Sequence, residues 1–158
     1  MIVIADTSPL NYLILIQEIE ILLKLYSRII VPQTVYDELL RPATPNIVRE
    51  WVSHLPEWIE VRAPRTSAKT LSSKLDPGER DAILLAEELR ADQLIIDDRE
   101  GRREAQKRGL LTIGTLGVLR EASVQGLVNI RAAVKRLEAT SFHIAPEVLA
   151  RVLTNPIP

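Results

Sequence analysis

Short apolar runs recur along the chain at intervals that are typical of buried β-strands. The first of them, MIVIA, is almost entirely aliphatic, and the runs RIIVP and WIEVRAP each stop at a proline. A continuous apolar run of this length, without polar alternation, is expected of a strand that is covered on both faces. The pattern predicts five strands, at Met1–Ala5, Arg28–Pro32, Trp58–Pro64, Gln93–Asp98 and Leu110–Thr115.

Between these runs, apolar residues recur at helical spacing. The sequence Asp76-Pro77-Gly78-Glu79 is a helix start, with a capping aspartate, a proline at the first helical position and an acid in the first turn. Residues 65–76 are predicted as a loop or an irregular helix. Helices are predicted over Ser8–Leu25, Gln33–Arg41 and Ile47–Leu55, from Asp76 to about Arg90, over Arg99–Gly109, and near 115–125, 129–138 and 146–153.

Strands that alternate with helices predict a parallel sheet with helices on both of its faces. The chain has 158 residues, which is the size of one domain with a substantial core. No internal repeat, linker or low-complexity segment divides it. We expect a single domain over residues 1–158, to which the helices of 129–158 form an appendage.

Composition and charge narrow the class of protein. Twenty basic and 21 acidic residues give a net charge of −1, so any nucleic-acid contact must depend on a local basic rim or on bound metal ions. The absence of cysteine excludes disulfides, thiolate zinc sites and cysteine nucleophiles. The apolar start carries Asp6 and lacks a basic leader, and no apolar stretch is long enough to span a bilayer. We expect a soluble cytoplasmic protein.

Acidic side chains lie where two of the predicted strands end. Asp6 follows the first strand, and Asp97 and Asp98 end the fourth. Because ligands of parallel sheets bind at the carboxyl ends of the strands, we expect Asp6 to face Asp97 or Asp98 there. Three further acids lie on predicted helices near strand ends, and helical spacing puts the first of them beside the packed face: Glu38, Glu79 and Asp81.

Carboxylates crowded in this way need a counter-charge, because each one raises the pKa of its neighbours. Mg²⁺ and Mn²⁺ prefer oxygen ligands and keep several of their waters. Such an ion lowers the pKa of a bound water and polarises a phosphoryl oxygen, as hydrolysis of a phosphodiester requires. The sequence therefore predicts a Mg²⁺ or Mn²⁺ site, with Thr7 and Ser8 placed to bond Asp6 or a phosphate.

Each acid taken alone has a simpler interpretation. An aspartate after a strand often forms a turn or caps a helix, which explains Asp6 as well as a metal does. A turn beside Arg99 is the better explanation of Asp97-Asp98 alone, and a solvated helix position is that of Glu38. Asp76 is assigned to capping. Only the combination at matching strand ends favours a metal site.

Three segments, in this order, resemble the PIN domain family: IADTSPL, VPQTVYDEL, and LDPGERDAILLAEELRADQLIIDDREGRREAQKRGLLTIGTLGVL. The likeness is to a subgroup with DTSPL, LDxGE and DDxxGR signatures, and it covers Ile2 to about Val128. The resemblance implies a three-layer α/β/α fold around a parallel sheet. It also implies a Mg²⁺- or Mn²⁺-dependent ribonuclease, in many members the toxin of a VapBC-type toxin–antitoxin pair, and a homodimer.

By this resemblance, Asp6 matches the first acid of the family and Glu38 the second. The third falls on Asp81, with Glu79 as a competitor or an additional ligand. The fourth falls within Asp97-Asp98, and strand alignment favours Asp98. Because Ile96 and Asp97 stand where the family usually has a small hydroxyl residue before this acid, the register here stays open.

Basic residues of 99–108 lie next to the last of these acids. Arg99, Arg102 and Arg103 are nearest, and of these Arg99 and Arg102 are the candidates to hold RNA phosphates. The alternative is a solvated helix face paired with Glu100 and Glu104. His54 and His143 fall outside every motif, which disfavours a metal-free ribonuclease that uses paired histidines.

Two other functional classes remain open from the sequence. A catalytically inactive PIN-like module would bind RNA or a protein, such as an antitoxin, without cleaving anything. A receiver-type phosphoryl domain would also place acids at strand ends, but the lysine after its last strand is missing here. The first helices carry more apolar residues than one buried face needs, which suits a homodimer interface: Leu10, Leu13, Ile14, Ile16, Ile19, Ile21, Leu22 and Leu23.

Overall fold

The sheet is parallel, as predicted. The computed structural model describes residues 1–66, 71 and 74–154. Within this part of the chain, five strands pair in the order β3-β2-β1-β4-β5. The predicted strands are all present and are shorter at their ends: β1 Val3–Ala5, β2 Ile29–Pro32, β3 Ile59–Arg62, β4 Gln93–Ile95 and β5 Thr112–Ile113.

The strand order fixes where a ligand can bind. The chain builds β1, β2 and β3 toward one edge of the sheet, then returns to place β4 on the other side of β1. In the central strand, Ile4 lies opposite Ile30 of β2 and opposite Leu94 of β4. The order therefore reverses between β1 and β4, and the helices that leave these two strands open a crevice at their carboxyl ends.

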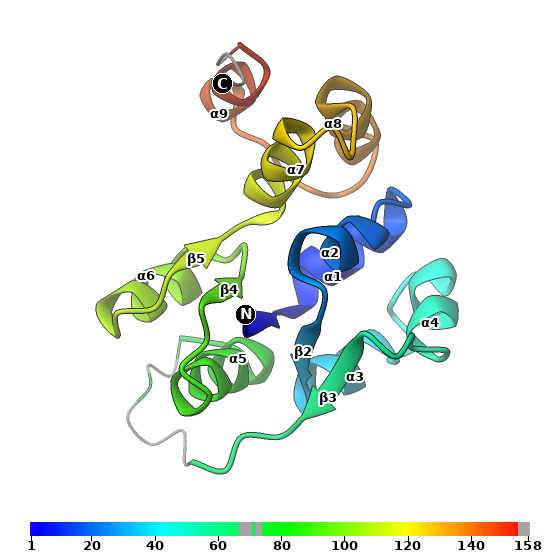
Figure 1. The fold of residues 1–158 in the computed structure, drawn as a ribbon. Coiled ribbons are helices and arrows are strands. Elements are labelled where there is room, and N and C mark those ends of the chain that lie inside the picture. Colours follow the sequence, from blue (N-terminus) through cyan, green and yellow to red (C-terminus); the bar gives the residue numbers. More distant parts are fainter. Residues whose placement is uncertain (67–70, 72–73, 155–158) are drawn as a thin grey trace.

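Helices cover both faces of the sheet, which makes the three-layer α/β/α fold that the sequence predicts (Figure 1). Alternate residues of β1 belong to different cores: Val3 and Ala5 pack with the first helices, whereas Ile4 packs with Ile83 and Ala105 on the opposite face. The helices are α1 Thr7–Leu15, α2 Glu20–Tyr26, α3 Gln33–Leu39, α4 Asn46–Val52, α5 Pro77–Glu88, α6 Arg99–Lys107, α7 Thr115–Val124, α8 Ile130–Glu138 and α9 Pro146–Thr154.

The helical pattern predicted over Ser8–Leu25 is divided between two helices. The structure ends α1 at Leu15 and starts α2 at Glu20, with Gln17 between them in the left-handed region at φ 61°. The N–H of Gln17 donates to Ile14 O (3.0 Å), and the N–H of Glu18 donates to Leu13 O (2.8 Å). These two bonds form a Schellman motif, which usually carries glycine where this chain has glutamine. Apolar spacing alone could not reveal the break.

The apolar surplus of these first helices is largely used inside the molecule. Leu23 is the most exposed of the set, at 37%, and the others are buried in the core around β1 and β2. The core therefore accounts for most of the pattern that suggested an interface. A homodimer stays a prediction.

The C-terminal helices differ in how they attach. Ala133 and Leu137 of α8 belong to the same buried cluster as Val3, whereas α9 has no buried residue among those described. Part of the predicted loop at 65–76 lies outside the described residues, namely 67–70 and 72–73. None of the helices described in the structure is long and apolar enough to cross a membrane.

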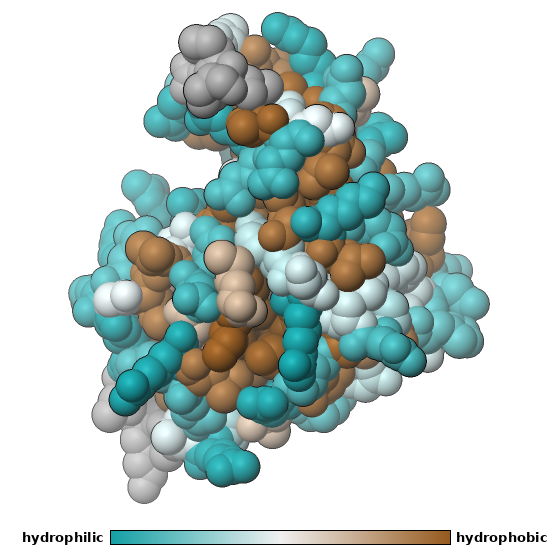
Figure 2. All heavy atoms as spheres, in the orientation of Figure 1, coloured by the Kyte–Doolittle hydropathy of each residue, from teal (hydrophilic) through white to brown (hydrophobic). Residues whose placement is uncertain are grey.

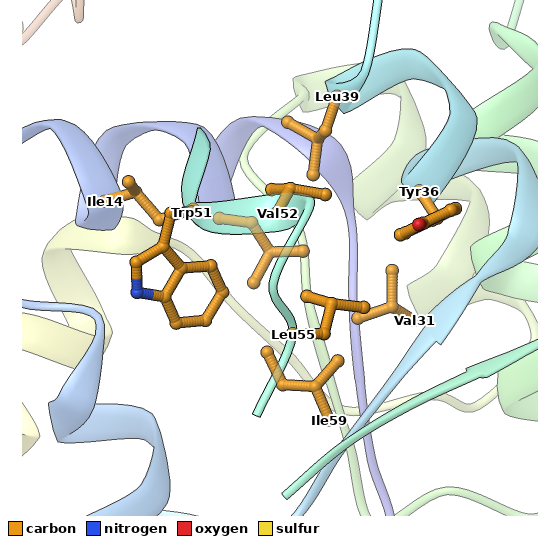
Figure 3. A pocket seen from close by; sticks show the side chains of 9 residues that line it. Ile14, Val31, Tyr36, Leu39, Trp51, Val52, Leu55 and Ile59 are labelled. Atoms are coloured by element: carbon orange, nitrogen blue, oxygen red, sulfur yellow. The ribbon is translucent and has the colours of Figure 1, made fainter. Parts of the chain in front are cut away.

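A small apolar pocket lies between α1, α3, α4 and the strands β2 and β3 (Figure 3). Its volume is about 10 Å³, roughly the space for one water molecule. We call it the apolar pocket; it is lined by Leu10, Ile14, Val31, Tyr36, Leu39, Trp51, Val52, Leu55 and Ile59.

The two ends of the strands present different chemistry. At the amino ends, Met1 and Ile2 are exposed, and Figure 2 shows apolar surface gathered between α5 and β2, near the amino terminus, with hydrophilic side chains around it. The carboxyl ends carry the predicted acids. The candidate site therefore lies at the carboxyl ends of the strands, where α1 and α6 begin.

Candidate active site

Asp6 follows β1 and is held as a continuation of that strand. Its backbone N–H donates to Ile95 O of β4 (2.9 Å), so the residue stays in the ladder after β1 ends. Its side chain is only 4% exposed, and its Oδ1 is buried without a hydrogen-bond partner. Burial raises the pKa of the Asp6 carboxyl to about 7, and the charges of Asp76, Glu38 and Asp97 add to the rise. A buried acid with an unpaired oxygen is unusual, and this marks Asp6 as a candidate functional residue.

Asp6 opens onto a cleft of about 550 Å³. We call it the acidic cleft, because five carboxylates line it: those of Asp6, Glu38, Asp76, Glu79 and Asp98. Its other lining residues are Thr7, Ser8, Asn11, Tyr12, Leu39, Arg41, Ala43, Thr44 and Pro45. The structure thus brings five acids from four separate segments to the crevice between β1 and β4 that the strand order predicts.

Glu38 reaches this cleft from α3. The hydroxyl of Thr7 donates to Glu38 Oε2 (2.7 Å) and ties the start of α1 to α3. The Glu38 carboxylate also lies against Gly78 at the start of α5, where an added Cβ would stand 2.9 Å from Glu38 Oε1. Glycine at position 78 therefore provides the space for this carboxylate. Helical spacing in the sequence correctly favoured Glu38 over Asp37.

Asp76 and Glu79 form the α5 side of the cleft. Asp76 caps the helix as predicted, since its Oδ1 accepts the N–H of Glu79 (2.8 Å). Glu79 is 8% exposed, and its pKa is raised to about 8, first by burial and then by its hydrogen bond to Asp76 and the nearby acids. The capping pattern predicts the first role of Asp76 but does not reveal that its carboxylate also lines the cleft. The available signal was its spacing, one helical turn before Glu79.

Asp81 lies elsewhere. Its Oδ2 accepts the hydroxyl of Thr34 on α3 (2.9 Å), and it does not line the acidic cleft. Two helical residues apart, Glu79 and Asp81 point to different sides of α5, so only one of them can face the cleft. The geometry places Glu79 there, although alignment with the family's third acid favoured Asp81.

Asp97 and Asp98 are adjacent in sequence but differ in surroundings. Asp97 accepts hydrogen bonds from Ser8 Oγ (3.0 Å), Thr115 N (2.7 Å) and Thr115 Oγ1 (2.7 Å). It therefore joins the end of β4 to the starts of α1 and α7, and Ser8 is engaged with Asp97 rather than with Asp6. Asp98 caps α6 by accepting the N–H of Gly101 (2.9 Å) and lines the acidic cleft.

Comparison with protein families identifies the fold. A family model described as PIN domain matches residues 2–156. The chain belongs to the PIN domain family. The match runs beyond the sequence signatures, through the C-terminal helices α8 and α9. No curated protein matches the chain. Membership indicates a nuclease-type fold, and PIN domains are generally hydrolases.

A second, basic depression adjoins the acids of this PIN domain. We call it the arginine groove; its volume is about 440 Å³, and Asp97, Arg99, Arg102, Arg103 and Gln106 line it. Arg103 pairs with Glu100 (3.8 Å), whereas no ion pair involves Arg99 or Arg102 within the described parts of the chain. Neither histidine lines the acidic cleft. Arg99 and Arg102, whose guanidinium groups suit phosphate, therefore lie next to Asp97 and the acidic cleft.

The donor set of the PIN domain fits a hard divalent ion that keeps some of its waters. Over residues 1–66, 71 and 74–154, no group of three or more acidic or histidine side chains is arranged to enclose an ion directly. The buried Oδ1 of Asp6 nevertheless has no partner, and the raised pKa values of Asp6 and Glu79 reflect like charges and burial that a cation would offset. Mg²⁺ is commonly held by one or two carboxylates with waters between it and the rest.

Proposed function

We propose that this PIN domain is a metal-dependent endoribonuclease that hydrolyses RNA phosphodiester bonds with Mg²⁺ or Mn²⁺. The observation that supports it is the unpaired, buried Oδ1 of Asp6 at the floor of a cleft lined by five carboxylates. Burying an acid beside other acids costs free energy, and arrangements of this kind cluster at functional sites. A bound cation resolves that conflict and suits phosphodiester chemistry.

Asp6, Glu79 and Asp98 are the acids we assign to the ion, directly or through water, with Glu38 and Asp76 completing the cleft. When bound, the ion lowers the pKa of a water and stabilises charge on the phosphate oxygens. We prefer Glu79 to Asp81 as the third acid, because Asp81 is bonded to Thr34 away from the cleft. We likewise prefer Asp98 to Asp97 as the fourth.

The remaining side chains orient the site. Thr7 holds Glu38 through its hydroxyl, and Ser8 holds Asp97, so both hydroxyls fix acids before any substrate arrives. Arg99 and Arg102 are the cations we assign to RNA phosphates, because they line the adjoining groove and are exposed. An RNA strand lying across the end of β4 would contact both depressions.

We also propose that the enzyme acts as the toxin of a toxin–antitoxin pair. The support is the resemblance of its signatures to toxin members of the family. An antitoxin, if present, is expected to suppress cleavage by the purified protein. A tight complex that leaves cleavage unchanged would count against this role.

The test is cleavage of structured and single-stranded RNA by the purified protein with Mg²⁺ or Mn²⁺. Chelation by EDTA should abolish cleavage, and added Mn²⁺ should restore it. Two charge-neutralising variants on one helix test the site itself: Glu79→Gln should lose more than roughly a hundredfold in rate, as removal of a metal contact does, and Asp81→Asn should lose less. The reverse order would return the third acid to Asp81.

The alternative is an inactive PIN-like module that binds RNA or a protein. Binding of Mn²⁺ to the folded state raises the melting temperature, whereas a module without a metal site shows no such rise. A Mn²⁺-dependent rise that is absent in Asp6→Asn, together with cleavage, supports the enzyme. The same rise without cleavage of any RNA would support the binding module.

A further inference from the structure

The acidic cleft has two chemically different parts. All five carboxylates belong to the part near the ends of β1 and β4 and the start of α5. The rest of the lining carries none: it consists of Asn11, Tyr12, Arg41, Ala43, Thr44 and Pro45 with Leu39. An aromatic ring, an amide and a guanidinium are poor metal ligands, but they are groups that contact nucleosides.

Helix α1 sets the separation between the two parts. Thr7, at the start of the helix, holds Glu38, and Tyr12 lies five residues further along. At 1.5 Å of rise per residue, this puts Tyr12 roughly 7.5 Å beyond Thr7 along the helix axis. Four residues from Ser8, Tyr12 lies on the same side of α1 as the residues that begin the site. The ring thus stands within reach of a substrate group next to the reacting phosphate.

The Tyr12 ring is held in place by a segment distant in sequence. It packs edge to face with Phe142, with ring centroids 4.9 Å apart and planes at 80°. Its hydroxyl forms a hydrogen bond with Ser141 Oγ (2.8 Å). Phe142 and Ser141 both lie between α8 and α9, so the C-terminal part of the chain supports this wall of the cleft. A fixed, half-buried ring loses little freedom when a base stacks on it.

We propose that Tyr12, with Asn11 and Arg41, forms a nucleobase subsite in which a base of the RNA strand stacks on the tyrosine ring. The inference rests on the proposed function, since it takes RNA as the substrate. Aromatic stacking accepts any base, and the exposed guanidinium of Arg41 contacts the phosphate on the far side of the stacked base. Phe142 and Ser141 are positioning residues, because they act through Tyr12.

The test is equilibrium binding of short single-stranded RNAs with Mn²⁺ present, in an Asp6→Asn background that blocks cleavage. The RNAs are one intact sequence and a series in which each position in turn is abasic. One abasic position should weaken binding to the parent by about tenfold to a hundredfold, the range of single-base stacking. In Tyr12→Leu, binding of intact RNA should fall by the same factor, and the abasic RNA should bind no worse than the intact one.

Matched variants separate stacking from other roles. Tyr12→Phe keeps the ring and should bind within about twofold of the parent, since the hydroxyl is already engaged by Ser141. Phe142→Leu should reduce the abasic penalty without abolishing it. Arg41→Gln should lower the slope of log affinity against log salt by about one, whereas Arg28→Gln, at the amino ends of the strands, should leave it unchanged.

The outcomes distinguish this inference from the proposed function. An abasic penalty that persists in Tyr12→Leu, or one that is absent at every position of the parent, overturns the subsite. If Tyr12→Leu does not fold, the abasic series on the parent and on Phe142→Leu still decides. RNA cleavage without any dependence on Tyr12 would support the nuclease and overturn the subsite. Tyr12-dependent binding by a protein that never cleaves RNA would support the subsite and overturn the nuclease.

Discussion

The acidic cleft and the apolar pocket share two walls. Helices α1 and α3 contribute residues to both, and Leu39, seen in the apolar pocket in Figure 3, lines both cavities. Helix α1 contributes Thr7, Ser8, Asn11 and Tyr12 to the cleft, and it contributes Leu10 and Ile14 to the pocket. The same two helices therefore carry the polar site on one side and its hydrophobic support on the other.

The two cavities differ in whether their lining groups have all their interactions satisfied. The apolar pocket holds about 10 Å³ of space, so its side chains lose little packing. The acidic cleft holds about 550 Å³, with two buried acids, one of which has an unpaired oxygen. Packing around the pocket stabilises a fold that the cleft destabilises. Variants on the two sides should therefore change stability and activity in different combinations.

The largest effect is expected for Asp6→Asn. Cleavage should fall by more than about a hundredfold, because the acid with the unpaired oxygen is lost. Without divalent cations at pH 8, the melting temperature should instead rise by a few degrees, since about 1 kcal/mol corresponds to about 2–4 °C in a chain of this size. Cleavage assays and thermal denaturation with and without Mn²⁺ measure both effects.

The sign of the stability change is the decisive part. A melting temperature that falls in Asp6→Asn without cations would mean that the ionised acid is already compensated in the fold. The acidic cleft would then be an ordinary polar surface, and its contrast with the apolar pocket would disappear.

Leu39→Ala tests the opposite side. Leu39 is 2% exposed, so the substitution should lower the free energy of unfolding by about 2–5 kcal/mol, as truncation of a buried leucine does. Chemical denaturation measures this. The neighbouring Glu38→Gln is the matched control and should reduce cleavage with little loss of stability. If Glu38→Gln destabilises the protein as much as Leu39→Ala does, Glu38 is a structural residue.

Periodicity predicted much of this arrangement because it reflects the core directly. Continuous apolar runs located the strands, and Asp6 and Asp98 follow from the rule that parallel strands present their carboxyl ends at one edge. Glu38 follows from its place next to Leu39 on a helix. These inferences need only local spacing and the direction of the strands.

The parts that the sequence did not reveal depend on contacts between distant segments. The choice of Glu79 over Asp81 depends on how α5 is rotated against α3, where Thr34 engages Asp81. The sequence leaves Asp97 as a candidate metal ligand, but its oxygens accept three hydrogen bonds from Ser8 and Thr115, which only the folded chain brings together. Asp76 serves as a cap and as a cleft acid at once, and a capping rule reveals only the first role.

The stability of the protein should depend on pH through the acidic cleft and not through the apolar pocket, because only the cleft contains buried acids. Asp6 and Glu79 have pKa values raised to about 7 and about 8, so the folded protein retains protons that the unfolded chain releases at lower pH. Without divalent cations, the free energy of unfolding should therefore fall between pH 5 and pH 8, by several kcal/mol, and level off above that.

Denaturation at a series of pH values measures this fall, and Asp6→Asn should reduce it. The lowered pKa of Glu88 has the opposite sign, but its contribution is complete above the ordinary pKa of a glutamate and does not mask the window. A profile that is flat from pH 5 to pH 8 would contradict the burial of ionisable groups in the acidic cleft.

The smallest effect is expected from filling the apolar pocket. Val52→Ile adds one methylene at a residue that lines it (Figure 3). Burial of that group contributes about 0.8 kcal/mol, and removing the void adds roughly 0.2 kcal/mol, so stability should rise by at most about 1 kcal/mol. Cleavage should not change, because the acids on the other side of α1 and α3 keep their contacts. A loss of more than about 1 kcal/mol would show that the pocket is already fully packed, and a change in cleavage would show that the two cavities are mechanically coupled through Leu39.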